Sequence, residues 1–122
     1  MPPVVGRIRR QATFRALSRP DGRAQMGTVA VAFSGHVPEV TNVPLVGYSI
    51  GRRHGGAVER NRLRRRLRAA VRASGPELAA GAYLVRAAPG AGELGFEELR
   101  GAVRAAARAA AAGVGGEGSR IL

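Results

Sequence analysis

The sequence contains no cysteine and no lysine, and its 8 acidic residues stand against 20 basic ones, all of them arginine. The absence of cysteine excludes a disulfide framework and a thiolate metal site, and it fits a reducing cytosol without requiring one. The absence of lysine accompanies an abundance of Ala, Gly, Arg and Val, which indicates genomic base composition rather than function. Arginine keeps its proton near neutral pH, so binding through these side chains should be insensitive to ordinary pH changes.

Long hydrophobic runs are also missing. No apolar segment approaches the roughly 20 residues of a membrane span, and residues 1–7 lack the apolar core of a signal peptide. The chain of 122 residues fits one domain. We therefore expect a monomeric, cytoplasmic protein with a single domain over residues 1–112 and a flexible, glycine-rich tail over 113–122.

The acidic residues are scattered along the chain, at positions 21, 39, 59, 77, 93, 97, 98 and 117. A metal-dependent nuclease needs carboxylates that meet around its ions, so this scatter argues against a self-sufficient nuclease. His36 and His54 are isolated, and we expect each to lie at the surface or to contact RNA. Glu97 and Glu98 are expected to balance the positive start of the last helix.

Periodicity predicts six elements. Apolar residues repeating every three or four positions predict helices over 7–17, 57–73 and 96–112. Runs of β-branched residues predict strands over 26–33, 43–50 and 82–87. The order α-β-β-α-β-α favours an α/β (α+β) two-layer sandwich. In the second strand Val46, Tyr48 and Ile50 share one face, while Gly47 and Ser49 leave room on the other.

The segment 52–72 holds nine arginines and one acid, Glu59, so it carries a net charge of 9 − 1 = +8 out of +12 for the chain. Within it Leu63, Leu67, Ala70 and Val71 fall on one helical arc that can pack on a sheet. The opposite arc consists of Asn61, Arg64, Arg65, Arg68 and Arg72. Like charges four residues apart repel by a few tenths of a kcal/mol, which disfavours a merely solvated face. The segment therefore predicts a helix that binds nucleic-acid phosphates.

Two adjoining segments carry a family resemblance: VGYSIGRR at 46–53 and GAVERNRLRR at 56–65. They resemble the bacterial ribonuclease P protein component, in which a Gly-x-Ser-Val-x-basic-basic strand end runs into a Gly-x-Ala-Val-x-Arg-Asn-Arg helix. Segments 7–10, 82–89 and 96–99 support the resemblance, which covers roughly residues 7–112.

The resemblance implies a small α/β sandwich, similar in shape to one ribosomal-protein domain, with a left-handed crossover around the arginine-rich helix. It implies two partners, a large catalytic RNA and precursor tRNA. Together the subunits of ribonuclease P remove the 5′ leader by metal-dependent hydrolysis, and the RNA with its bound Mg²⁺ performs the chemistry. The protein holds the single-stranded leader between its first helix and the sheet, while the arginine-rich helix docks on the catalytic RNA.

The resemblance also assigns residues. The implied RNA contacts are Arg52, Arg53, Arg60, Asn61, Arg62, Arg64, Arg65 and Arg68. The implied leader cleft contains Phe14, Phe33 and Ser49. Ser18 stands where the family often has a second aromatic residue, so leader stacking should be weaker here. A place in the core is the alternative for Phe14, and a general RNA- or DNA-binding protein of ribosomal or nucleoid type is the alternative for the whole chain.

Overall fold

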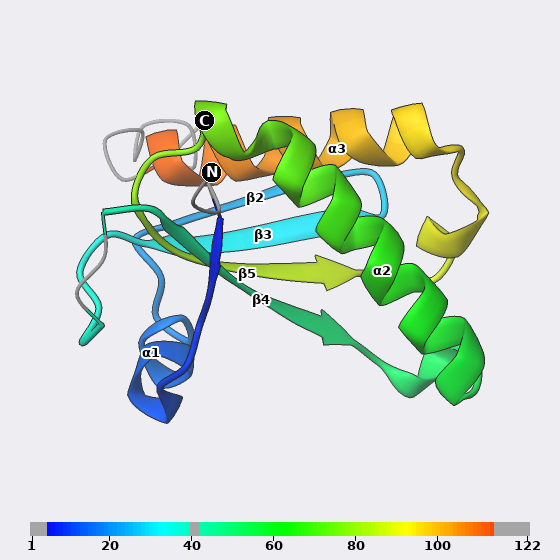
Figure 1. The fold of residues 1–122 in the computed structure, drawn as a ribbon, viewed down its shortest axis with the longest axis horizontal. Helices are drawn as coiled ribbons and strands as arrows, with labels where there is room; N and C mark the ends of the chain where they lie inside the picture. Colours follow the sequence, from blue (N-terminus) through cyan, green and yellow to red (C-terminus); the bar gives the residue numbers. More distant parts are fainter. Residues whose placement is uncertain (1–4, 40–41, 114–122) are drawn as a thin grey trace.

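Two long helices cover one face of a five-stranded mixed sheet, and a short helix lies against the opposite face (Figure 1). The computed structural model describes residues 5–39 and 42–113. The strands are β1 (Gly6–Arg7), β2 (Gly22–Met26), β3 (Val29–Ser34), β4 (Pro44–Ile50) and β5 (Gly81–Ala87), in the sheet order β1-β4-β5-β3-β2. The helices are α1 (Gln11–Ala16), α2 (Ala57–Ser74) and α3 (Phe96–Ala112), with short 3₁₀ turns η1 (Arg52–His54), η2 (Gly75–Glu77) and η3 (Ala91–Glu93).

The main core lies between the sheet and helices α2 and α3. Leu63 and Leu67 of α2 are buried there as their spacing predicts, and Leu99 and Val103 of α3 join them. Strand β2 passes close beneath α3, because a Cβ at Gly22 would come within 1.9 Å of the Ala110 carbonyl oxygen. Glycine at this position therefore allows the edge strand and the helix to touch. None of the described helices is long and apolar enough to cross a membrane.

Helix α2 connects β4 to β5, which pair in parallel. In Figure 1 both strands run from left to right with β5 above β4, and α2 crosses in front of the sheet. The crossover is therefore left-handed, as the resemblance implies and against the usual preference for right-handed connections.

The N-terminal third differs from the expected elements. The strand expected at 26–33 corresponds to β3, which begins three residues later, and the sequence did not predict β2, which pairs with it in a hairpin. The hairpin turns at Gly27, whose φ of +58° favours glycine. The helix expected at 7–17 is shorter, because Gly6 and Arg7 pair with β4 as the separate strand β1. The expected tail beyond residue 113 lies outside the described residues.

Helix α1 is fixed by a residue from the loop that follows β3. The backbone amides of Arg9 and Arg10 donate hydrogen bonds of 2.9 and 2.6 Å to Oε1 of Glu39. These amides lie directly before the helix, where backbone donors lack partners within the helix. Glu39 therefore anchors the two residues that lead into α1.

Candidate nucleic-acid interface

The outer face of α2 presents the arginine-rich segment. Its buried residues, Leu63, Leu67, Ala70 and Val71, turn the remaining side chains away from the core. The exposed or half-buried residues of this helix that the sequence nominates are Arg60, Asn61, Arg62, Arg64, Arg65 and Arg68. Within the described part of the chain, no arginine of α2 forms an ion pair. Their charge is therefore available to an anion from outside.

Two arginines of this helix differ from the rest. Arg66 donates hydrogen bonds to the carbonyl oxygens of Gly92, at 3.0 Å, and Leu94, so it fastens α2 to the segment before α3. Arg60 is half-buried, and its Nε has no hydrogen-bond partner among the described residues. A buried donor of this kind needs an acceptor from outside the described residues, which water or a bound molecule can supply.

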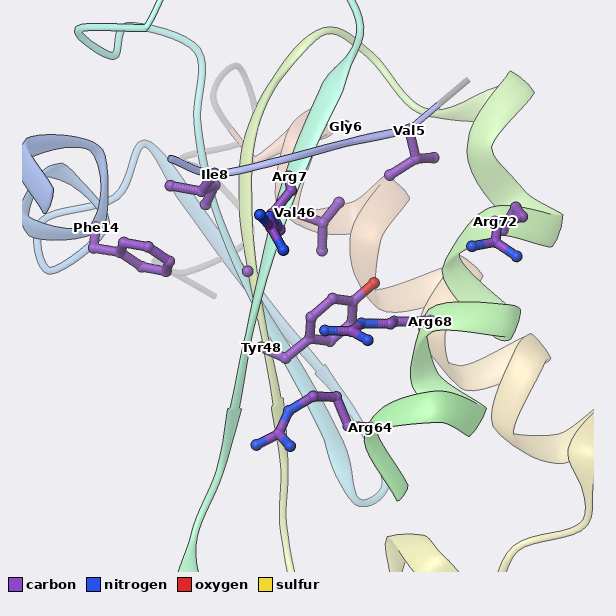
Figure 2. A pocket seen from close by; sticks show the side chains of 11 residues that line it. Val5, Gly6, Arg7, Ile8, Phe14, Val46, Tyr48, Arg64, Arg68 and Arg72 are labelled. Carbon is purple, nitrogen blue, oxygen red and sulfur yellow. The ribbon is translucent and has the colours of Figure 1, made fainter. Parts of the chain in front are cut away.

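A groove of about 320 Å³ separates α2 from the N-terminal segment at the edge of β4 (Figure 2). Arg64, Arg68 and Arg72 line it from α2, and Phe14 and Gly47 line the opposite side. We call it the Phe14 groove. Its other lining residues are Val5, Gly6, Arg7, Ile8, Val46 and Tyr48.

Phe14 lies directly on the backbone of β4. A Cβ at Gly47 would come within 2.5 Å of Phe14 Cε1, so glycine is what lets the ring settle there. The residue stays 38% exposed, which places it at the surface of the groove rather than inside the core. An exposed aromatic ring beside cationic side chains suits the stacking of an unpaired base.

Tyr48 faces α2 within the groove. The guanidinium carbon of Arg68 lies 5.9 Å from the centre of its ring, a cation–π arrangement. Burial raises the pKa of Tyr48 to about 12, although the charges of Arg68 and Arg72 oppose the rise. The hydroxyl therefore keeps its proton at neutral pH and can donate a hydrogen bond. Sequence reasoning missed Tyr48 because its face of β4 also carries the buried Val46 and Ile50.

The other two residues nominated for the leader cleft lie on opposite faces of the sheet. Ser49 is exposed and shares the face of Gly47, two positions earlier on β4. Phe33 is only 4% exposed and packs against Tyr83, with ring centres 4.9 Å apart, in the core beneath α2 and α3. The expected place of Phe33 in a cleft is therefore corrected, because the alternation along β3 turns its ring toward the covered face.

The nominated basic pair, Arg52 and Arg53, lies in η1 between β4 and α2, and both residues are exposed. The next residue, His54, has its Nε2 2.8 Å from the carbonyl oxygen of Ala87 at the end of β5. This contact fastens the turn to the sheet, so the basic pair stands on a fixed support beside the start of the arginine-rich helix.

A second groove, of about 500 Å³, lies beside α1 on the same face of the sheet. Ala30 and Ala32 of β3 form part of its lining, and Arg23 and Arg86 contribute from the neighbouring strands. We call it the Arg86 groove, and it is lined by Leu17, Ser18, Arg23, Ala24, Gln25, Ala30, Val31, Ala32 and Arg86. No aromatic or acidic side chain is among these. Sequence reasoning missed Arg23 and Arg86, which stand far apart in the chain.

The described residues provide little for a metal ion. No group of three His, Asp or Glu side chains comes together among them. Hard cations such as Mg²⁺ prefer several oxygen ligands, with carboxylates foremost among protein groups. Glu77 and Glu39 instead accept hydrogen bonds, from the Arg104 side chain and from the backbone amides of Arg9 and Arg10 respectively.

Comparisons of sequence agree with one another. A family model described as Ribonuclease P matches residues 3–111. The Ribonuclease P protein component of Acidothermus cellulolyticus is 39% identical over 100 residues, which cover 81% of this chain and 82% of that protein. The protein of the same name from Thermobifida fusca is 38% identical over 111 residues, which cover 84% of this chain and 74% of that protein.

Solved structures share the fold at low sequence identity. The RNase P protein of Staphylococcus aureus superposes with a TM-score of 0.70 at 19% identity, covering 84% of this chain and 92% of that one. The RNase P protein from Thermotoga maritima gives a TM-score of 0.67 at 21% identity, covering 80% and 90%. At such identities the agreement concerns the fold alone.

Proposed function

The chain belongs to the ribonuclease P protein family, and on that premise we propose that it binds the catalytic RNA of the enzyme and the 5′ leader of precursor tRNA. As a family member it is a protein component of an RNase P endoribonuclease complex. One observation carries the proposal: the arginine face of α2 borders the Phe14 groove and has no ion-pair partner among the described residues.

RNA phosphates are the partner that the α2 surface fits best. A guanidinium can bind a phosphate through two parallel hydrogen bonds, and it stays charged at every physiological pH. Asn61 accepts a 2.7 Å hydrogen bond from Nη1 of Arg64, which orients that guanidinium without neutralising it. The proposed contacts with the catalytic RNA are Arg52, Arg53, Arg60, Asn61, Arg62, Arg64, Arg65 and Arg68.

The Phe14 groove suits a single-stranded leader. Its exposed ring can stack on an unpaired base, while Arg64 and Arg68 on the facing helix can contact the neighbouring phosphates. Ser49, on the same face of β4, continues this surface with a small polar side chain. Phe33 has no part in the proposal because it is buried.

We assign no chemical step to the protein's side chains. In this proposal the catalytic RNA and the substrate hold the Mg²⁺ ions, which supply the hydrolytic chemistry. The arginines lower the repulsion between the phosphates of the two RNAs, so less Mg²⁺ is needed to bring them together. The complex works in the cytoplasm, where precursor tRNA is processed in bacteria.

Reconstitution tests the function. The purified protein should leave precursor tRNA intact, and adding its cognate catalytic RNA should give accurate 5′ cleavage at low Mg²⁺. The catalytic RNA without protein should need more Mg²⁺ and bind the substrate more weakly. Gel analysis of the cleavage products measures the Mg²⁺ requirement in a Mg²⁺ titration and the substrate affinity in a substrate titration.

Two other results would support different functions. Accurate cleavage by protein and metal without RNA would identify a self-sufficient nuclease. If the protein changed neither the Mg²⁺ requirement nor the substrate affinity of the catalytic RNA, a general nucleic-acid-binding role would replace the proposal.

A further inference from the structure

Four strands align a row of side chains on the sheet face that α2 and α3 do not cover. The strand register sets Gln25 of β2 beside Ala30 of β3, Ala30 beside Arg86 of β5, and Arg86 beside Ser49 of β4. Alternation along each strand places these residues on the same face as Gly47 and Phe14. The row therefore extends across the floor of the Arg86 groove toward the edge at β4.

Arg86 stands out in this row. It is exposed on β5, which lies in the middle of the sheet, and it has no hydrogen-bond or ion-pair partner in the part of the chain that the structure describes. Its neighbours Ala30 and Ser49 are small and leave its guanidinium accessible. Arg23, by contrast, donates a 3.2 Å hydrogen bond to the carbonyl oxygen of Ser18 at the end of α1.

The Phe14 ring is close to this arginine. The Phe14 ring packs on Gly47 of β4, which pairs with Leu84 of β5. Two positions further along these strands, on the same face, Ser49 pairs with Arg86. Two positions along a strand and one strand across correspond to a Cα separation of about 8 Å. One nucleotide of an extended strand can bridge that separation, with its base on Phe14 and an adjoining phosphate at Arg86.

We propose that Arg86 binds a leader phosphate next to the nucleotide that stacks on Phe14, so that the Arg86 groove reads the RNA backbone and not its bases. The inference rests on the proposed function, since it assumes that the leader crosses this face. Charge complementarity supports a polyanion here, because the lining contains Arg23 and Arg86 and no acidic residue. Backbone contacts carry no sequence information, and the groove lacks an aromatic ring on which a base could stack.

Affinity measurements on the reconstituted holoenzyme test the inference. We compare Arg86→Ala with wild type on precursor tRNA and on leaderless tRNA, over a range of salt concentrations. Arg86→Ala should bind precursor tRNA about threefold to tenfold more weakly and lower the salt slope by about one unit, whatever the leader sequence, with no change for leaderless tRNA. Arg86→Lys should retain most of the affinity. Arg100→Ala, which removes the same charge from α3, is the matched control and should behave as wild type.

A methylphosphonate scan locates the contact. Each leader linkage is neutralised in turn, and one linkage should weaken wild-type binding as much as Arg86→Ala does. That same linkage should have no further effect on Arg86→Ala, because both changes remove one interaction. The scan on wild type also serves if a substitution impairs folding.

The outcomes separate the inference from the function. If wild type prefers precursor over leaderless tRNA but Arg86→Ala keeps that preference, the inference is wrong and the proposed function stands. An equal loss on both RNAs, or a wild-type scan without a sensitive linkage, overturns it as well. If wild type shows no preference for a leader, leader binding by the protein fails, and the inference falls with it.

Discussion

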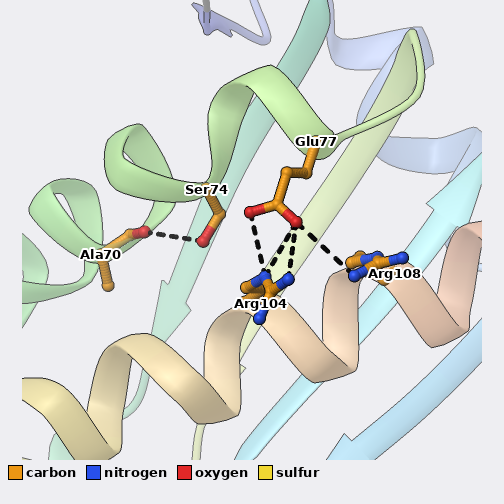
Figure 3. A network of polar contacts seen from close by, with 5 residues as sticks. All are labelled: Ala70, Ser74, Glu77, Arg104 and Arg108. Atoms are coloured by element: carbon orange, nitrogen blue, oxygen red, sulfur yellow. Dashed lines mark hydrogen bonds and ion pairs between the residues drawn. The ribbon is translucent and has the colours of Figure 1, made fainter.

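Helices α2 and α3 lie side by side and both present arginines to solvent, yet among the described residues only those of α3 have acidic partners. Figure 3 shows two of these, Arg104 and Arg108, at Glu77. Arg100 pairs with Glu97 at 2.6 Å, while Arg104 and Arg108 contact Glu77 at 2.7 and 3.5 Å. No arginine of α2 has an ion pair within the described residues. The position of acids, rather than the number of arginines, thus distinguishes a helix that joins parts of the protein from one suited to an external polyanion.

The α3 contacts also support the α2 surface. Glu77 lies in η2, directly after α2, and accepts hydrogen bonds from Nε and Nη2 of Arg104 at 3.0 and 2.7 Å. In the last turn of α2, the buried Ser74 donates a 3.2 Å hydrogen bond to the Ala70 carbonyl oxygen. The Glu77 contacts fasten the end of α2 to α3, and the Ser74 bond lies within the last turn of α2. The unpaired arginines therefore stand on a helix that is held at its C-terminal end.

The largest effect is expected when α2 loses its unmatched charges. Replacing Arg64, Arg65 and Arg68 with alanine should lower the slope of log affinity for the catalytic RNA against log salt by up to about two to three units, because up to three phosphate contacts are lost. Far-UV circular dichroism should show an intact fold, since these side chains are outside the core.

The matched control removes three arginines from α3, at positions 100, 104 and 108. It should leave the salt slope near that of wild type and lower the melting temperature, because internal ion pairs are broken. An equal fall in slope for both triple variants would show that total charge, and not its local matching, governs binding.

A smaller effect is expected when α2 is given an acid beside its unpaired arginines, since its one acid, Glu59, lies in the first turn and forms no ion pair among the described residues. Ala69 is exposed and lies one helical turn from Arg65 and Arg72, so Ala69→Glu supplies both with a partner. Affinity for the catalytic RNA should fall several-fold with a slope lower by about one unit, and the free protein should melt at a slightly higher temperature. Ala105→Glu, the matched change on α3, should leave binding near wild type; equal losses would contradict local matching.

The smallest effect concerns Glu77, which is exposed and pairs with Arg104 and Arg108 of α3. Hydrogen bonds from the Arg104 side chain hold the pKa of Glu77 below its ordinary value of 4.5. A lowered folded-state pKa adds stability above that ordinary value, and this stability is lost as pH falls through the folded-state pKa. The Glu77→Gln variant should therefore have a slightly lower melting temperature than wild type at pH 7. Its melting temperature should also fall less than that of wild type when the pH is lowered, as thermal unfolding followed by circular dichroism would measure. If the variant and wild type lost the same stability between neutral and acidic pH, the contact between Glu77 and Arg104 would not form in solution.

The long helices and three of the strands, β3, β4 and β5, could be predicted from sequence because each has a strong local pattern. The arc of Leu63, Leu67, Ala70 and Val71 fixes both the extent of α2 and its buried face. Strand β2 could not be predicted, because the turn that separates it from β3 depends on one residue, Gly27, and because its pairing with β3 is a contact between strands that its own pattern does not show. Helix α1 likewise depends on Glu39, far away in the chain.

The site divides in the same way. The family motif nominated the α2 arginines, which lie close together in sequence, and their role in binding stays a prediction. Strand alternation gave two equivalent faces for β3, and only the packing of α2 and α3 shows that Phe33 lies on the covered one. Tyr48 was missed because it shares a strand face with the buried Val46 and Ile50, and Arg86 because it is the one charged residue in an otherwise apolar strand. The roles proposed for them rest on residues of other elements, Arg68 beside Tyr48 and the Phe14 ring near Arg86.

The contact between Phe14 and Gly47 couples the residue types that two positions distant in sequence can accept. Any side chain at position 47 would displace the Phe14 ring from β4. If a smaller residue replaced Phe14, the space above Gly47 would open, and alanine at position 47 would then fit. In homologous chains, substitutions at positions 14 and 47 should therefore occur together. A mutant library that varies only one of the two positions would consist mostly of variants in which this contact is lost.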